Sequence, residues 1–339
     1  MNPIQDISAF VEHLDSLRQA AHIPGISVAI VKNQAIILAF GLGYSDIEHH
    51  VPATAETLYN IASVTKPISA VAALRLVEAG VLDLDRPLAE YSEWAAFCAK
   101  FSRQPSVFAR GLRCQPPIHT VRHLLSHTAT GTPGSQFSYN PVLYSWASRP
   151  IMAVADTSFS NLVERYVFAP AGMTRSARIH RDLPLREDLA KFLALPYRVG
   201  VSGVIECSPM PPLQGDGAAG GVITTVLDLA KFDIALDQGL LISGGSRAAM
   251  MAPIRTSNGE LLPYGLGWFV QEYEGRTLVW HSGWWEDAYS ALYLKIPFLD
   301  LTFIVFANSE GVWWRNPLDR AEVQRSEFAQ AFLRAFVDD

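Results

Sequence analysis

Apolar and polar residues alternate in two different patterns near the start of the chain. Between residues 6 and 20 the apolar positions lie three or four apart, which predicts an amphipathic helix. The apolar runs ISVAIV and AIILAF follow, and they flank Asn33 and Gln34. Two such runs around a two-residue turn predict a β-hairpin.

The pattern changes in the middle of the chain and returns near its end. Residues 62–210 contain helical segments and long loops rich in proline and glycine. Strand-like runs reappear after residue 260, and an amphipathic helix closes the chain. We therefore expect an α+β fold in which both termini contribute to one antiparallel sheet. Residues 1–60 and 215–339 would form this discontinuous α/β sheet domain with its flanking helices, and residues 61–214 an inserted, mostly helical domain.

Composition and charge narrow the class of protein. The chain has 339 residues, of which 49% are hydrophobic, so it can bury a large core. Its formal net charge is -6, and it contains no basic run. Because nucleic-acid binders carry a positive patch, we expect no nucleic-acid partner.

The chain also shows no pattern of a membrane or metal-thiolate protein. Its most apolar stretch is interrupted at residues 32–34 and is too short on either side to span a bilayer. Acidic residues occupy the segment that would be the apolar part of a signal peptide, so we expect a cytoplasmic protein without a membrane partner. Cys98, Cys114 and Cys207 lack metal-ligand spacing and are expected to be buried or idle thiols.

A candidate nucleophile lies in the stretch IASVTKPISA, where Ser63 precedes Lys66 by three residues. Pro67 is best tolerated in a first helical turn, which places Ser63 at the start of a helix. There the N–H of Ser63 and the helix dipole face an oxyanion formed at the serine, and a neutral Lys66 could take the hydroxyl proton. The alternative is that Ser63 only caps the helix and Lys66 is solvated.

Several segments carry a family resemblance. The stretch ETLYNIASVTKPISAVAALRLVEAGVLDLDRPLAEY resembles the serine-hydrolase superfamily of class C β-lactamases, penicillin-binding D-Ala-D-Ala peptidases and β-lactamase-like (family VIII) esterases. HTVRHLLSHTATG, PGSQFSYNPVLY, APAGMT, AAGGVITTVLDLAKF, YGLGW and HSGWW follow in the family's order. The resemblance covers most of residues 22–310 and implies a helical domain against an antiparallel sheet, with the active site in the groove between them.

The resemblance implies roles for individual residues. Ser63 would be the acylated nucleophile, Lys66 its proton acceptor and Tyr139 the proton relay to the leaving group. The backbone N–H groups of Ser63 and Trp284 would form the oxyanion hole. The residues expected to contact substrate are Asn140, His281, Ser282, Gly283 and Trp285.

The segment around Tyr139 departs from the family pattern. Tyr139 is followed by Asn140 and Pro141, whereas the family usually has Tyr-Ser-Asn or Tyr-x-Asn, so proline stands at the asparagine position. Either Asn140 takes over that role, or SYN is a Ser-x-Asn motif and Ser138 is the relay. The register of PG-x-x-F-x-Y favours Tyr139.

His281 replaces the lysine of the family's Lys-Thr-Gly segment. A mostly neutral imidazole weakens the binding of a substrate carboxylate, which disfavours β-lactams and peptidoglycan stems. We therefore expect a carboxylesterase for small or medium, apolar acyl or aryl esters. The alternatives are a D-amino-acid peptidase or amidase, an acyltransferase or weak β-lactamase, or a catalytically silent ligand-binding protein.

Other motifs predict no metal or cofactor. His119, His123 and His127 are four residues apart, and on a helix the outer two would lie about 12 Å apart, too far for one ion. GDGAAG at 215–220 follows a proline-rich loop and not a strand, so it is interpreted as a turn and not a dinucleotide site. The only partner predicted is a small ester or amide substrate, and no oligomeric state is predicted.

Overall fold

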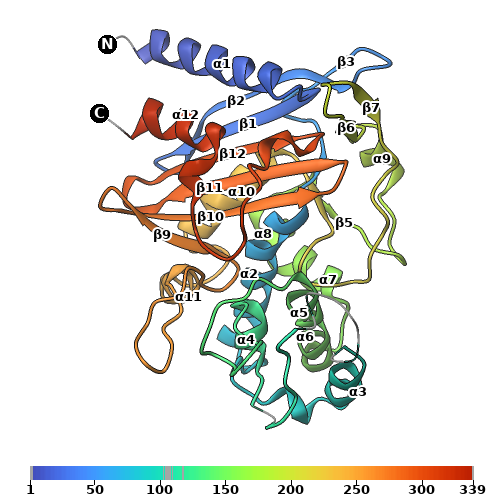
Figure 1. Cartoon of the computed structure of the whole chain (residues 1–339), viewed down its shortest axis with the longest axis vertical. Coiled ribbons are helices and arrows are strands. Elements are labelled where there is room, and N and C mark those ends of the chain that lie inside the picture. The colour runs from blue at the N-terminus through green and yellow to red at the C-terminus, as the bar shows by residue number, and fades with distance from the viewer. Residues whose placement is uncertain (1–2, 102, 104–107, 109, 117, 338–339) are drawn as a thin grey trace.

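The computed structural model describes residues 3–101, 103, 108, 110–116 and 118–337. Its first helix, α1 (Pro3–Ala20), and its last, α12 (Glu327–Phe336), lie next to each other on one side of the central sheet (Figure 1). The ring of Phe10 contacts that of Phe336 edge-on, with centroids 5.1 Å apart. The two ends of the chain are therefore joined by apolar packing.

The central sheet confirms the predicted fold class. It is antiparallel and has seven strands in the order β3-β2-β1-β12-β11-β10-β9 (Figure 1). The strand bounds are β1 Gly25–Lys32, β2 Ala35–Asp46, β3 Val51–Pro52, β9 Phe269–Tyr273, β10 Arg276–Trp285, β11 Tyr289–Ile296 and β12 Leu301–Ala307. In the middle of the sheet Ile26 of β1 lies opposite Ala307 of β12, so strands from both ends of the sequence are direct neighbours.

The predicted hairpin is also present. β1 and β2 are joined at Asn33 and Gln34, whose φ angles are 51° and 58°. Two-residue hairpin turns of this kind need positive φ at both positions, and asparagine tolerates it well. This turn sets the register of the first two strands.

The middle of the chain is mainly helical, and several of its helices gather below the sheet in Figure 1. Its helices are α2 Thr65–Glu78, α3 Ser92–Phe101, α4 Val121–Leu125, α5 Pro141–Trp146, α6 Ser148–Ala155, α7 Phe159–Val163, α8 Ala169–Ala171, α9 Glu187–Ala190, α10 Val226–Asp237 and α11 Gly244–Met251. Its short strands are β4 Tyr59–Asn60, β5 Ala177–Arg178, β6 Tyr197–Val199, β7 Ile205–Cys207 and β8 Val222–Thr224. They form a small β4-β8-β5 sheet and a β6-β7 pair.

Alternate residues of β1 bury into two separate apolar clusters, as expected for a strand covered on both faces. One cluster, with α1 and α12, includes Ile26, Val28 and Ile30. The other includes Ala29 and Val31 and continues through α2 into the helical segments. Because this second cluster crosses from the sheet to the helices, the division into domains at residues 60 and 215 stays a prediction.

The prediction for two of the cysteines is wrong. Cys98 on α3 and Cys114 form a disulfide with a Cα–Cα distance of 6.1 Å, within the usual range for such bonds. Cys207 is unpaired but exposed. The pairing depends on how α3 packs beside the segment that follows it, which the spacing of the cysteines does not reveal.

Candidate active site

Ser63 lies in a short 3-10 turn, Ala62–Val64, that leads directly into α2. Asn60 holds this turn from the N-terminal side, since its Oδ1 accepts a hydrogen bond of 3.0 Å from the Ala62 N–H. Ala62 has a φ of 46°, a left-handed conformation that costs a non-glycine residue about 1–2 kcal/mol. Backbone strain of this kind is common at functional sites. Pro67 falls in the first turn of α2, as predicted.

The hydroxyl of Ser63 does not cap the helix. The residue that precedes α2 is Val64, and no side chain caps this end of the helix. The Ser63 Oγ instead accepts a hydrogen bond of 2.7 Å from the Nζ of Lys66. The geometry therefore favours the nucleophile hypothesis over the capping alternative.

Lys66 is a buried amine without a counter-charge. Its side chain is fully buried, and its Nζ also donates to the Ala219 carbonyl at 3.3 Å. Burial lowers the pKa of Lys66 well below its usual value, and no carboxylate of the described chain opposes this shift. A lysine in such a site is readily deprotonated, so its nitrogen can accept the proton of the Ser63 hydroxyl.

Tyr139 completes the group around the serine. Its ring centroid lies 5.0 Å from the Lys66 Nζ, and its side chain borders the same cavity as Ser63. Burial raises the pKa of the Tyr139 hydroxyl, while a hydrogen bond with Ser63 acts in the opposite direction. The phenol is therefore protonated at neutral pH and can donate a proton.

Asn140 and Pro141 have structural roles at the start of α5. The Asn140 Oδ1 accepts from the Leu143 N–H at 3.0 Å, and its Nδ2 donates to the Phe108 carbonyl at 2.7 Å. Both polar atoms of this side chain therefore have protein partners, and the expected contact of Asn140 with substrate stays a prediction. Pro141 is the first residue of α5 and lines the cavity.

The rival relay, Ser138, does not line this cavity in the described part of the chain. Its backbone N–H donates to the His127 carbonyl at 2.8 Å. Tyr139, which both lines the cavity and contacts Ser63, is the better placed of the two.

His281 is not among the described residues that line the cavity. It is fully buried, and its Nε2 forms a 2.9 Å hydrogen bond with the Tyr264 hydroxyl. Burial lowers its pKa well below the usual value, and the nearby Lys66 adds to this effect. The imidazole is therefore neutral, and its predicted contact with substrate stays a prediction. Ser282, the next residue, does line the cavity and accepts from the Asn316 Nδ2 at 3.3 Å.

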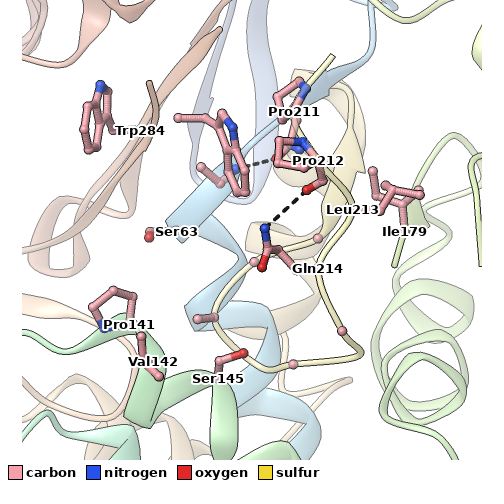
Figure 2. Close-up of a pocket in the computed structure, with 18 of the residues that line it drawn as sticks. Ser63, Pro141, Val142, Ser145, Ile179, Pro211, Pro212, Leu213, Gln214 and Trp284 are labelled. Carbon is pink, nitrogen blue, oxygen red and sulfur yellow. Dashed lines mark hydrogen bonds between the residues drawn. The ribbon is translucent and has the colours of Figure 1, made fainter. Parts of the chain in front are cut away.

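The cavity in front of Ser63 measures about 450 Å³ and has mainly apolar walls. Figure 2 shows Ser63 between Trp284 on one side and the loop of residues 211–214 on the other. The ring of Trp284 stacks on that of Trp313 with centroids 4.6 Å apart, and its Nε1 donates to Glu310. The larger apolar lining residues are Phe108, Pro141, Val142, Ile179, Pro211, Pro212, Leu213, Trp284, Trp285, Trp313 and Leu318.

Gly283 explains how strand β10 comes close to the serine. A Cβ at this position would lie 2.2 Å from the Ile61 carbonyl oxygen, so only glycine permits the approach. This contact brings the backbone at residues 283–284 next to the segment that ends at Ser63. The predicted pairing of the Ser63 and Trp284 N–H groups as an oxyanion hole is consistent with this approach and stays a prediction.

His119, His123 and His127, which are four residues apart in the sequence, each have a separate set of contacts. The His119 Nε2 donates to the Ala129 carbonyl at 2.9 Å, and the His123 Nδ1 accepts from the Thr120 N–H at 3.1 Å. The His127 Nδ1 accepts from the Asn140 N–H at 3.0 Å. Across the described residues, no three His, Cys, Asp or Glu side chains gather as a metal-binding group.

Other parts of the cavity were not predicted from the sequence. The loop PPLQ at 211–214 and the glycine-rich turn after it form one wall, together with Asn60 and Ser145. A Cβ at Gly217 would lie 1.8 Å from the Ser145 Oγ, which explains a glycine there. Two prolines beside a glycine-rich turn signal a rigid loop, but its place opposite Ser63 depends on the tertiary fold.

Comparison with known proteins agrees with this geometry. The profile of the family described as Beta-lactamase matches residues 10–325. A penicillin-binding protein of Bacillus subtilis (strain 168) is 26% identical, with 88% of this chain and 68% of the relative covered. Protein flp of Staphylococcus aureus (strain NCTC 8325 / PS 47) is 25% identical over 90% of this chain, which spans only 63% of that protein's length.

Two solved structures share the fold. An octameric penicillin-binding protein homologue from Pyrococcus abyssi has a TM-score of 0.78 at 24% identity, and covers 97% of this chain and 77% of its own. The D-amino acid amidase of Ochrobactrum anthropi SV3 has a TM-score of 0.76 at 19% identity, with 98% of both chains covered. With the family profile extending over nearly the whole sequence, these likenesses place the chain in the Beta-lactamase family of serine hydrolases.

Proposed function

We propose that this protein is a carboxylesterase that works through an acyl-enzyme on Ser63. A neutral Lys66 accepts the Ser63 proton as Oγ attacks the ester carbonyl. The backbone N–H groups of Ser63 and Trp284 stabilise the tetrahedral oxyanion. Tyr139 gives its proton to the departing alcohol oxygen as the ester C–O bond breaks, and takes one back from the Lys66 ammonium. Water then attacks the acyl-enzyme with the same groups in reverse.

The composition of the cavity wall is the main support for an uncharged ester substrate. Among the described residues that line the cavity, none is Lys or Arg. At the position of the family's lysine stands His281, which is buried and neutral. Binding a substrate carboxylate here would leave an anion without a partner in an apolar site, which is unfavourable. An uncharged acyl or aryl group gains from the same apolar surface.

A panel of chromogenic substrates tests this proposal. We expect p-nitrophenyl acetate, butyrate and octanoate to be hydrolysed with a kcat/KM at least about 100-fold above that of a chromogenic cephalosporin or D-alanyl p-nitroanilide. The measurement is the initial rate of chromophore release by the wild-type protein. A higher kcat/KM for the anilide would point to the amidase alternative, and one for the cephalosporin to the β-lactamase alternative.

The choice of relay residue leads to a second prediction. Tyr139→Phe removes the only hydroxyl of that side chain and should lower kcat for p-nitrophenyl butyrate about 10²- to 10⁴-fold, the usual range for a general acid or base. Ser138→Ala should leave kcat within about threefold, because Ser138 does not border the cavity. If instead only Ser138→Ala loses turnover, the Ser-x-Asn interpretation holds.

A cytoplasmic location remains part of the proposal. No helix of the described chain has the length and apolar character to cross a bilayer. The Cys98–Cys114 bond is more typical of oxidising compartments. Thiol labelling of the protein purified from its native cells, before and after reduction, tests the location: reduced cysteines would support the cytoplasm, and a paired Cys98–Cys114 would contradict it.

A further inference from the structure

His127 is a buried residue next to the catalytic group without an assigned role in the chemistry above. It lies just after α4, is only 2% exposed, and has a φ of 56°. This left-handed conformation is uncommon for residues other than glycine, although histidine, asparagine and aspartate adopt it more often than most. Uncommon backbone conformations of this kind cluster at functional sites.

Two hydrogen bonds connect His127 to both neighbours of Tyr139. The Ser138 N–H donates to the His127 carbonyl at 2.8 Å. The Asn140 N–H donates to the His127 Nδ1 at 3.0 Å. One residue thus holds the backbone on either side of Tyr139, which restricts how that side chain can move.

The imidazole also packs on the ring that it helps to place. Its centroid lies 4.3 Å from that of Tyr139, with 36° between the planes. The rings of Tyr144 and Tyr264 lie 5.1 Å and 4.9 Å away. Tyr139 is therefore held by its backbone on both sides and by a ring on one face.

The hydrogen-bond pattern assigns the protons of His127. Nδ1 accepts from a backbone N–H, so the proton of the neutral ring is on Nε2. Burial lowers the pKa of His127, and the neighbouring Lys66 and His281 lower it further. Nε2 has no hydrogen-bond partner among the described residues. With its lone pair occupied, His127 is suited to hold a neighbour in place and not to transfer protons.

We propose that His127 is a positioning residue for Tyr139, which orients the phenol hydroxyl toward Ser63 through the Asn140 N–H bond and the ring contact. This inference rests on the acyl-enzyme chemistry of the proposed function. It does not depend on whether the preferred substrate is an ester or an amide.

A double-mutant cycle with Tyr139→Phe tests this role. The variant His127→Gly removes both the acceptor and the ring, and glycine accepts a φ of 56° without strain. His127→Asn tolerates the same φ and retains an acceptor close to the Nδ1 position. The matched control is His123→Asn, because the Nδ1 of His123 also accepts a backbone N–H, from Thr120. Each variant is assayed with the best substrate of the panel, after a check of Tm.

We expect His127→Gly to lower kcat about 10- to 100-fold with KM within about threefold, and His127→Asn to recover kcat to within about fivefold of wild type. In the Tyr139→Phe background, adding His127→Gly should lower kcat by less than about twofold, because the hydroxyl that His127 positions is absent. His123→Asn should match wild type within about twofold.

Other results would overturn the inference. Full additivity of His127→Gly with Tyr139→Phe would mean that His127 acts elsewhere, and an unchanged kcat in folded His127→Gly would mean that it has no such role. If His127→Gly does not fold, His127→Asn decides: a kcat within about fivefold supports the role, and a loss as large as that of Tyr139→Phe contradicts it. A wild type that turns over no panel compound and is not labelled at Ser63 by a fluorophosphonate overturns this inference together with the proposed function. Preference for the anilide overturns only the ester proposal.

Discussion

Ser63→Ala should lower kcat for p-nitrophenyl butyrate by about 10⁴-fold or more, to near the rate of the protein-free reaction. The change removes the atom that forms the covalent bond and leaves Lys66 without its 2.7 Å partner. A fluorophosphonate should add its mass to the wild-type protein and not to the variant. Initial rates and intact-protein mass spectrometry measure the two effects.

Ser145→Ala is the matched control for this prediction. Ser145 lines the same cavity, but it is the Ser63 hydroxyl that accepts the hydrogen bond from Lys66. We expect Ser145→Ala to retain kcat within about fivefold and to be labelled normally. Should folded Ser63→Ala retain its activity, another nucleophile would be at work. A wild-type protein that is neither active nor labelled would point to the silent ligand-binding alternative.

The overall fold could be predicted because its determinants are local or repeated. The turn at Asn33 and Gln34 follows from residues that tolerate positive φ, and its flanking runs are long enough to pair. Strands at both ends of the sequence left few ways to bury their apolar faces other than a shared sheet, and β1 does pair with β12. Disulfide formation between Cys98 and Cys114 depends on the packing of α3 and carried no such local signal.

The side chains around the nucleophile were harder to predict than the nucleophile. Asn140 was expected to contact substrate, whereas in the structure its side chain accepts from the Leu143 N–H and donates to the Phe108 carbonyl. His281 lies close to the catalytic group, with its ring centroid 6.1 Å from that of Tyr139. Its full burial and its bond to the Tyr264 hydroxyl depend on the tertiary fold and carried no signal in the sequence.

The proposed mechanism requires a neutral Lys66 amine, and the structure shows what makes it neutral. In the structure burial alone lowers its pKa, and its hydrogen bonds go to the Ser63 hydroxyl and the Ala219 carbonyl. A buried amine without a carboxylate partner is unfavourable for folding when charged, so the residue that enables the chemistry should destabilise the protein.

Lys66→Met therefore should separate activity from stability. Methionine fills a similar volume without a base, so kcat/KM for p-nitrophenyl butyrate should fall about 10³-fold, and the acid limb of the wild-type pH profile, which reports neutral Lys66 and lies well below pH 10.5, should disappear. The free energy of unfolding at pH 7 should rise, because the variant avoids burying an amine that binds a proton when unfolded.

The stability difference between Lys66→Met and the wild type should change with pH in a defined direction. Between the lowered pKa of folded Lys66 and its unfolded value of about 10.4, the unfolded wild type binds more protons than the folded one, so wild-type stability rises with pH. The advantage of Lys66→Met in urea unfolding should therefore shrink from pH 7 to pH 10. Lys191→Met, at an exposed lysine, should change neither kcat/KM nor this trend. A Lys66→Met variant that is less stable at pH 7, by a margin that stays constant or shrinks from pH 7 to pH 10, would show that folded Lys66 is charged, and a charged amine could not take the proton of Ser63.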